Sequence, residues 1–133
     1  MEKVVFWKDR DRRTIDPTLF SAQAEETAKR IRRDHDRSPK ANKRTQIRKF
    51  YDEVLRLDQL AQSAASQWET VLPQVHMLVA KAAYAKGREL ISDDFLSFIR
   101  GSIAQIEKPE DLSVFANFFE AFMGFYRMYG PRN

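Results

Sequence analysis

Apolar residues recur every three or four positions along most of the chain, which is the spacing of one buried face on an α-helix. The clearest case runs from Asn42 or Lys43 to Ser63. Its repeating positions are Ile47, Phe50, Val54, Leu57 and Ala61. The run at residues 4–7 (VVFW) is the only one that could pair as a strand, and it could equally pack as an aromatic plug against the body. The pattern predicts an all-α fold.

A first, weakly amphipathic helix is predicted from Asp16 and Pro17 to about Asp34. Aspartate is a preferred N-cap, and proline at the first helical position gives up no needed hydrogen bond. Ser38 and Pro39 should end this helix, because proline lacks a backbone N–H and clashes with the preceding turn. Residues 35–42 are therefore expected to form a mobile basic loop before the second helix.

Three further helices are predicted in the second half of the chain. Proline inside a helix costs about 3 kcal/mol, so we expect a break or a kink at Pro73 and a third helix from there to Gly87. Ser92 should cap a fourth helix, and Pro109 should open a fifth that ends before Gly130. The fifth is apolar over about half its circumference, which requires burial from two sides, by its own bundle or by a partner chain. The fold class predicted is a small bundle of four to five helices.

The length of 133 residues suits one domain with a real core. We expect a single helical domain over residues 16–130, an N-terminal basic segment over 1–15 that could be flexible, and a tail over 131–133. No stretch approaches the ~20 apolar residues of a membrane span, and charges interrupt residues 1–15 too often for a signal peptide. The chain has no cysteine, which suits a reducing compartment. A soluble, cytoplasmic protein without a membrane partner is expected.

Positive charge is concentrated in one segment. The whole chain carries +4, but residues 29–49 hold ten lysines and arginines against two aspartates, which leaves a net −4 for the rest. A basic cluster on a mildly acidic body is typical of proteins that bind a polyanion, above all nucleic acid. The alternative is an ordinary solvated charged loop.

The residues that could carry catalysis do not form a recognisable site. His35 lies between Asp34 and Asp36, but neighbouring side chains in such a run point in different directions. Asp93 and Asp94 are adjacent helix positions that N-terminal capping already explains. The sequence has no glycine-rich phosphate loop. We therefore expect no catalytic residues, no metal site and no cofactor.

Two sets of basic residues could bind a phosphate backbone. Arg44 and Arg48 are one helical turn apart and could each bind a phosphate with two hydrogen bonds, and a tyrosine beside them, Tyr51, could stack on a base or pack half into the core. A second set lies around the end of the third helix. If the second and third helices pack side by side, the two sets would line one groove. Contact with the backbone and little sequence preference are expected.

Three stretches of the chain resemble a known family. They are NKRTQIRKFYDEVLRL (42–57), LPQVHMLVAKAAYAKGRELISDDFLSFI (72–99) and LSVFANFFEAFMGFYRMYG (112–130). Together they are similar to the small helical subunit of the type III-A CRISPR–Cas (Csm) effector complex. The resemblance covers about residues 40–130.

This resemblance implies a subunit without a catalytic site of its own, present in several copies along a ribonucleoprotein. Its implied partners are the guide RNA/target RNA duplex, copies of itself, and other Csm-complex subunits including the large subunit and the backbone subunits. The positions that best match the family's RNA contacts are Lys43, Arg44, Arg48, Lys49, Lys81, Lys86 and Arg88. Two alternatives stay open: a helical protein–protein interaction module, and a nucleic-acid-binding regulator outside CRISPR systems.

Overall fold

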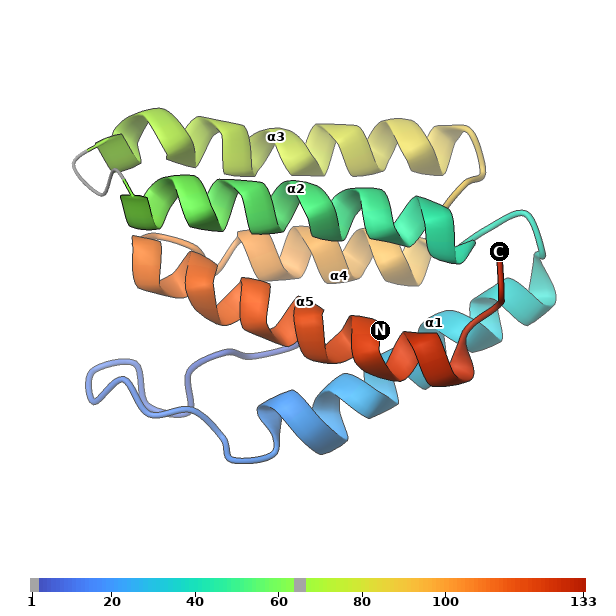
Figure 1. Cartoon of the computed structure of the whole chain (residues 1–133), viewed down its shortest axis with the longest axis horizontal. Helices are drawn as coiled ribbons and strands as arrows, with labels where there is room; N and C mark the ends of the chain where they lie inside the picture. Colours follow the sequence, from blue (N-terminus) through green and yellow to red (C-terminus); the bar gives the residue numbers. More distant parts are fainter. Residues whose placement is uncertain (1–2, 64–66) are drawn as a thin grey trace.

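The computed structural model describes residues 3–63 and 67–133, and five α-helices fill most of them (Figure 1). Within these residues there is no β-strand, only an isolated bridge between Asp9 and Thr14. The predicted all-α bundle is confirmed. The helices are α1 (Ala24–Arg37), α2 (Arg44–Ser63), α3 (Trp68–Gly87), α4 (Asp93–Ile103) and α5 (Pro109–Tyr129).

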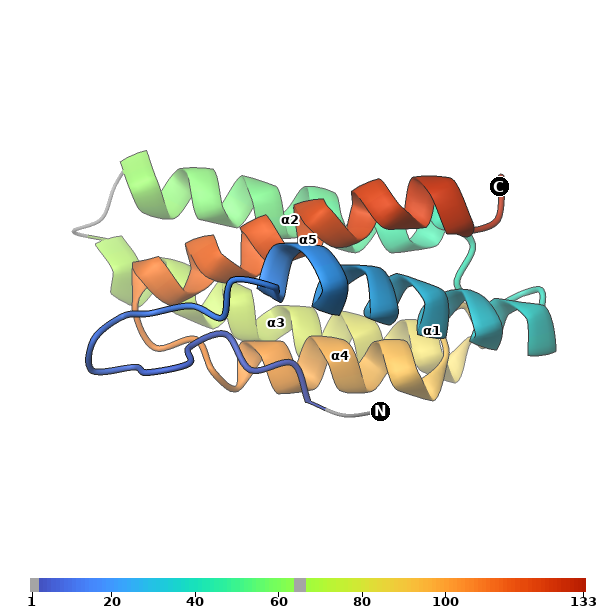
Figure 2. The same cartoon turned by 90° about the horizontal axis from the view of Figure 1, so that it is seen from below.

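The helices form a bundle in which α2 and α3 lie side by side and α5 packs against both α1 and α2 (Figures 1 and 2). α4 packs against α3 and contacts α1. Inside the bundle, the phenyl rings of α4 and α5 form one cluster. The ring of Phe98 lies within 5.6–5.9 Å of the rings of Phe115, Phe118, Phe119 and Phe122. The wide apolar arc of α5 is therefore buried from two sides by the chain's own helices.

The first helix begins later and ends later than predicted. Asp16 accepts hydrogen bonds from the backbone N (2.8 Å) and hydroxyl (2.7 Å) of Thr18, so it closes a turn instead of capping an α-helix. One wide turn of π-helix, η1 (Leu19–Gln23), follows before α1. α1 then continues to Arg37, because the N–H of Ser38 still reaches the carbonyl of Asp34 (3.0 Å) and only Pro39 lacks a donor.

The prediction that the third helix starts at Pro73, after a break, is wrong. α3 starts at Trp68 and keeps Pro73 inside it. Proline there removes one hydrogen bond, but the turn before it is held by tertiary contacts, since Val71 is buried and the indole of Trp68 donates to the carbonyl of Glu107 (2.9 Å). Packing has overridden the local helix preference. The predicted starts at Ser92 and Pro109 are confirmed, and the Ser92 hydroxyl accepts from the N–H of Phe95 (3.2 Å).

The loop between α1 and α2 is short and anchored at its second end. Asn42 is fully buried with a positive φ of 61°. Its side-chain amide donates to the carbonyl of Ile31 (3.2 Å) and to the hydroxyl of Ser92 (2.9 Å), and its oxygen accepts from the N–H of Ser92 (2.9 Å). Its own carbonyl accepts from the hydroxyl of Tyr126 (2.6 Å). Mobility of the loop stays a prediction for the exposed residues 38–40.

The segment before η1 packs onto the bundle beside α4 and α5 (Figure 2). Phe6 is fully buried and its ring stacks on Phe115 at 5.8 Å. The indole of Trp7 donates to Asp111 (2.7 Å), and Arg10 donates to the same carboxylate (2.9 Å). Of the two alternatives for residues 4–7, the structure therefore has the aromatic plug. None of the described helices combines the length and the apolar character that crossing a membrane would require.

Candidate nucleic-acid interface

A groove with a volume of about 530 Å³ runs between α2 and α3. The two basic sets are expected to line one groove if the second and third helices pack side by side, and α2 and α3 do pack side by side. Three of the predicted RNA-binding residues line it: Lys49 from α2, Lys81 from α3, and Arg88 just beyond the end of α3. Arg56 adds a fourth cation to the lining.

The groove also contains two carboxylates that the sequence analysis did not single out, Asp52 and Glu53. Glu53 is hydrogen-bonded by Arg56 three residues later and by Lys81 from α3 (3.0 Å). The bond from Arg56 is the main cause that lowers the pKa of Glu53, against a smaller opposing effect of burial. Glu53 is therefore ionised at neutral pH. The spacing of Glu53 and Arg56 by three could have predicted their pairing, but only the packing of α3 brings Lys81 to the same carboxylate.

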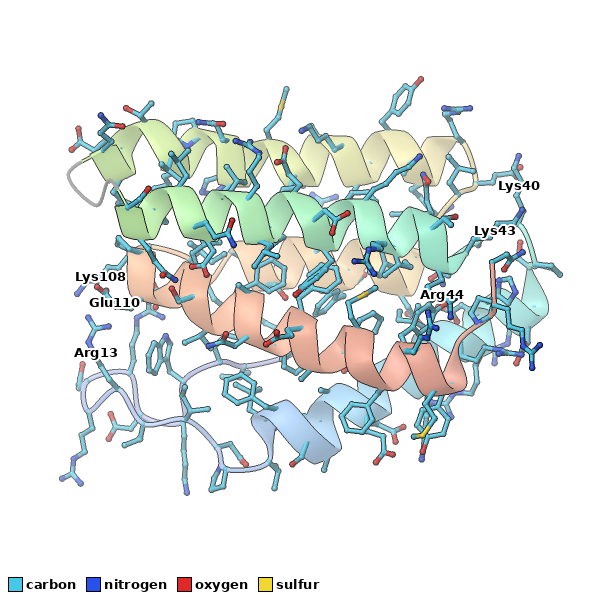
Figure 3. The ribbon with its side chains drawn as sticks, in the orientation of Figure 1. Arg13, Lys40, Lys43, Arg44, Lys108 and Glu110 are labelled. Atoms are coloured by element: carbon cyan, nitrogen blue, oxygen red, sulfur yellow. The ribbon has the colours of Figure 1, made fainter. Side chains whose placement is uncertain are left out.

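A second group of predicted cations lies at the beginning of α2 and outside the groove lining. Lys43 and Arg44 mark this end of the molecule, with Lys40 in the preceding loop (Figure 3). The guanidinium of Arg44 donates to the carbonyl of Arg132 (2.8 Å), and Arg48 lies 3.8 Å from Asp52. The cations of α2 thus extend from the groove towards the helix N-terminus.

Lys86 is the predicted residue that the fold separates from the others. Its ammonium group lies 3.6 Å from Asp93, and it lines a different hollow, of about 410 Å³, that also contains Asp34 and Asp94. Lys81 and Lys86 are five residues apart on α3, which turns their side chains by about 140° relative to each other. The two lysines therefore face different surfaces.

Several residues considered for other roles have structural contacts. The ring of Tyr51 packs on Phe119 at 5.5 Å, so the interpretation as a partly buried core residue is confirmed. Asp94 forms an ion pair with Arg30 (3.0 Å). His35 lies within 2.7 Å of the carbonyl of Ala41. In residues 3–63 and 67–133 no group of three or more histidines and carboxylates is placed to hold a metal ion.

Comparison with known proteins supports the resemblance. A family model described as Csm2 Type III-A matches residues 15–132. No curated protein and no solved structure matches the chain. The match covers all five helices and leaves the packed segment before residue 15 outside it.

Proposed function

The chain belongs to the Csm2 family of type III-A systems and is a small subunit of the Csm complex, assembled with other subunits of that complex. On this premise we propose that it is a non-catalytic subunit that stacks in several copies along the complex. We further propose that it contacts the backbone of the guide RNA/target RNA duplex through its basic face. The proposed contacts on this face are Lys43, Arg44, Arg48, Lys49, Lys81 and Arg88, with Lys86 on the adjoining surface.

The observation that carries this proposal is the set of cations without a carboxylate partner. Among the described residues, Lys43, Arg44, Lys49 and Arg88 form no ion pair with an acidic side chain. Their charges are therefore available to phosphates, whereas those of Arg48, Lys81 and Lys86 are partly neutralised by Asp52, Glu53 and Asp93 respectively. Arginine binds phosphate oxygens with two parallel hydrogen bonds, and the narrow major groove of an A-form duplex hides the base edges. Binding should therefore depend on salt more than on sequence.

The alternative of a protein–protein interaction module loses its main support. It required the phenylalanine-rich fifth helix to offer an apolar surface to a partner. Phe115, Phe118, Phe119 and Phe122 are instead fully buried within the bundle. The basic face remains the stronger candidate for a functional surface.

Changing Arg44 and Arg48 together to alanine is expected to flatten the salt dependence of binding to a guide–target RNA duplex. Each phosphate contact contributes about 0.9 to the slope of log K against log salt concentration for B-form DNA, so the double variant should lose roughly two units if both residues touch phosphates. The measurement is a titration of labelled duplex at four salt concentrations.

The matched control is a double change of Arg12 and Arg100 to alanine, which removes the same charge elsewhere. Both side chains are exposed, Arg12 in the N-terminal segment and Arg100 on α4. This control should keep most of the slope. An equal loss in both double variants would mean that only net charge matters, and an unchanged slope in the first would contradict contact between α2 and phosphate.

A further inference from the structure

The groove between α2 and α3 has an apolar floor. Phe50, Leu78 and Ala85 form it together with the half-buried Leu90, and apolar atoms make up most of its exposed lining. Its volume of about 530 Å³ lies within the range of roughly 300–1,000 Å³ typical of small-molecule pockets. A phosphate backbone does not need such a floor, but the flat face of a nucleobase does.

The charges in the groove are arranged to hold a phosphate outside it and a neutral group inside. Asp52 and the ionised Glu53 offset the charges of Arg56 and Lys81, so the interior attracts a phosphate less than the edge does. Lys49 and Arg88 lack carboxylate partners among the described residues and can bind a phosphate at the edge. The group that fits between these charges is apolar on its faces and has N–H donors on its edge.

An exposed aromatic ring stands beside this edge. The side chain of Tyr84 is 69% exposed, and the guanidinium of Arg88 lies over its ring at 5.8 Å. Exposed aromatic rings paired with arginine provide stacking surfaces for bases in proteins that bind single-stranded nucleic acid. Tyr84 is therefore suited to stack on a second base or on the ribose.

Glu53 gives the groove a preference among bases. A carboxylate can accept about four hydrogen bonds, and Arg56 and Lys81 use two of them. Guanine has two adjacent N–H donors, N1–H and the N2 amino group, which match the two oxygens of a carboxylate. Uracil has one N–H flanked by two carbonyls, and the carboxylate repels these two carbonyl oxygens. Adenine and cytosine each offer only an amino group.

From this arrangement we propose that the groove binds one unpaired nucleobase of the RNA, with guanine preferred through Glu53. The inference rests on the proposed RNA-binding function and adds a second mode of contact to it. A paired base has its Watson–Crick edge occupied by its partner, so the ligand is a nucleotide outside the duplex pairing. Its phosphate lies near Lys49 and Arg88, and its base enters above Leu78 and Ala85.

The test uses the full chain and three probes, GMP, UMP and inorganic phosphate, titrated while NMR shifts of Leu78 and Ala85 are followed. GMP should bind about tenfold more tightly than UMP, the discrimination expected of one good bidentate contact. GMP should also shift the NMR signals of Leu78 and Ala85 in the groove, whereas inorganic phosphate should shift only those of Lys49 and Arg88 at its edge. Equal affinities for GMP and UMP, or no shift of the groove signals with GMP, would overturn the proposal.

Changing Glu53 to glutamine separates a base-binding role from simple electrostatics. The variant should lose the preference for GMP over UMP and bind inorganic phosphate more tightly, since Lys81 and Arg56 lose their acidic partner. Glu69→Gln, an exposed carboxylate at the start of α3, is the matched control and should keep the preference. A variant that binds all three probes more tightly but keeps the preference would also overturn the proposal. Because Arg44 and Arg48 lie outside the groove lining, the duplex titration tests the proposed function separately.

Discussion

Replacing Asn42 with alanine is expected to lower the free energy of unfolding by about 4 kcal/mol. The change removes three hydrogen bonds that the fully buried side chain makes to Ile31 and Ser92, each worth about 0.5–1.5 kcal/mol, and it leaves the N–H of Ser92 without its acceptor, which costs more. Alanine also tolerates the φ of 61° less well than asparagine, whose short polar side chain can hydrogen-bond locally in this left-handed conformation. Urea unfolding followed by circular dichroism measures the loss.

Two further variants separate the contributions at this position. Asn42→Gly keeps the positive φ without strain, so it should be less destabilising than Asn42→Ala by about 1 kcal/mol. Tyr126→Phe removes the hydroxyl that donates to the carbonyl of Asn42, in a site where burial raises the pKa of Tyr126 well above its usual range, and should cost about 1–2 kcal/mol. A loss below 1 kcal/mol for Asn42→Ala would show that these bonds contribute little.

Asn42 also bears on the basic face. It directly precedes Lys43 and Arg44, and its bonds tie the start of α2 to α1, α4 and α5. The destabilised Asn42→Ala variant should therefore bind the RNA duplex less tightly even under conditions where it stays folded. The slope of log K against log salt concentration should fall for this variant only if the first turn of α2 is displaced. An unchanged slope with weaker binding would therefore distinguish destabilisation from the loss of an arginine.

Changing Asp111 to alanine is expected to lower the free energy of unfolding by roughly 3–4 kcal/mol at neutral pH. The carboxylate is 1% exposed and accepts hydrogen bonds from the indole of Trp7, from Arg10, and from the backbone N–H groups of Glu107 (2.9 Å) and Lys108 (3.0 Å). Removing it leaves the indole of Trp7 and the two backbone N–H groups without this acceptor, while Arg10 keeps its contact with Glu107. The attachment of the N-terminal segment to α5 is weakened and then depends mainly on Phe6 packed against Phe115. Breaking a buried charge pair by removing one partner typically costs about 3–5 kcal/mol, and the exposure of Arg10 reduces that here.

The effect of Asp111 should depend on pH. Burial alone would raise the pKa of this carboxyl, but the bonds from Glu107, Trp7, Lys108 and Arg10 together hold it below its ordinary value of 3.8. Its contribution to stability is therefore fully present above pH 3.8 and is lost as the pH falls through the lowered pKa. Thermal unfolding of wild type and Asp111→Ala at pH 7, 4 and 2 should show the difference shrinking only at the lowest value.

A second variant measures how much one donor to Asp111 contributes. Trp7→Phe keeps an aromatic ring but removes the indole N–H that donates to Asp111, so it should cost about 1 kcal/mol and leave the pH dependence in place. If Asp111→Ala and wild type had the same stability at pH 7, the N-terminal segment would not be held by this carboxylate.

Local residue types were sufficient to predict most of the secondary structure. The starts of α4 at Ser92 and α5 at Pro109 follow from capping chemistry that acts within one turn. The buried stripe of α2 follows from periodicity alone, because a helix that presents Ile47, Phe50, Val54 and Leu57 on one face must bury that face. The family motifs and the basic residues of α2 can also be recognised from the sequence, because identifying them requires no knowledge of tertiary contacts.

Tertiary structure decided what local patterns cannot encode. Pro73 stays within α3 because Trp68 and Val71 are held by distant parts of the chain. Which of Lys81 and Lys86 lines the groove depends on which face of α3 meets α2, and Glu53 becomes part of a site only when α3 brings Lys81 to it. Periodicity determines which residues are buried, because it needs only the helix repeat. Which helices pack together, and therefore which polar side chains meet, depends on the free energy of the whole core.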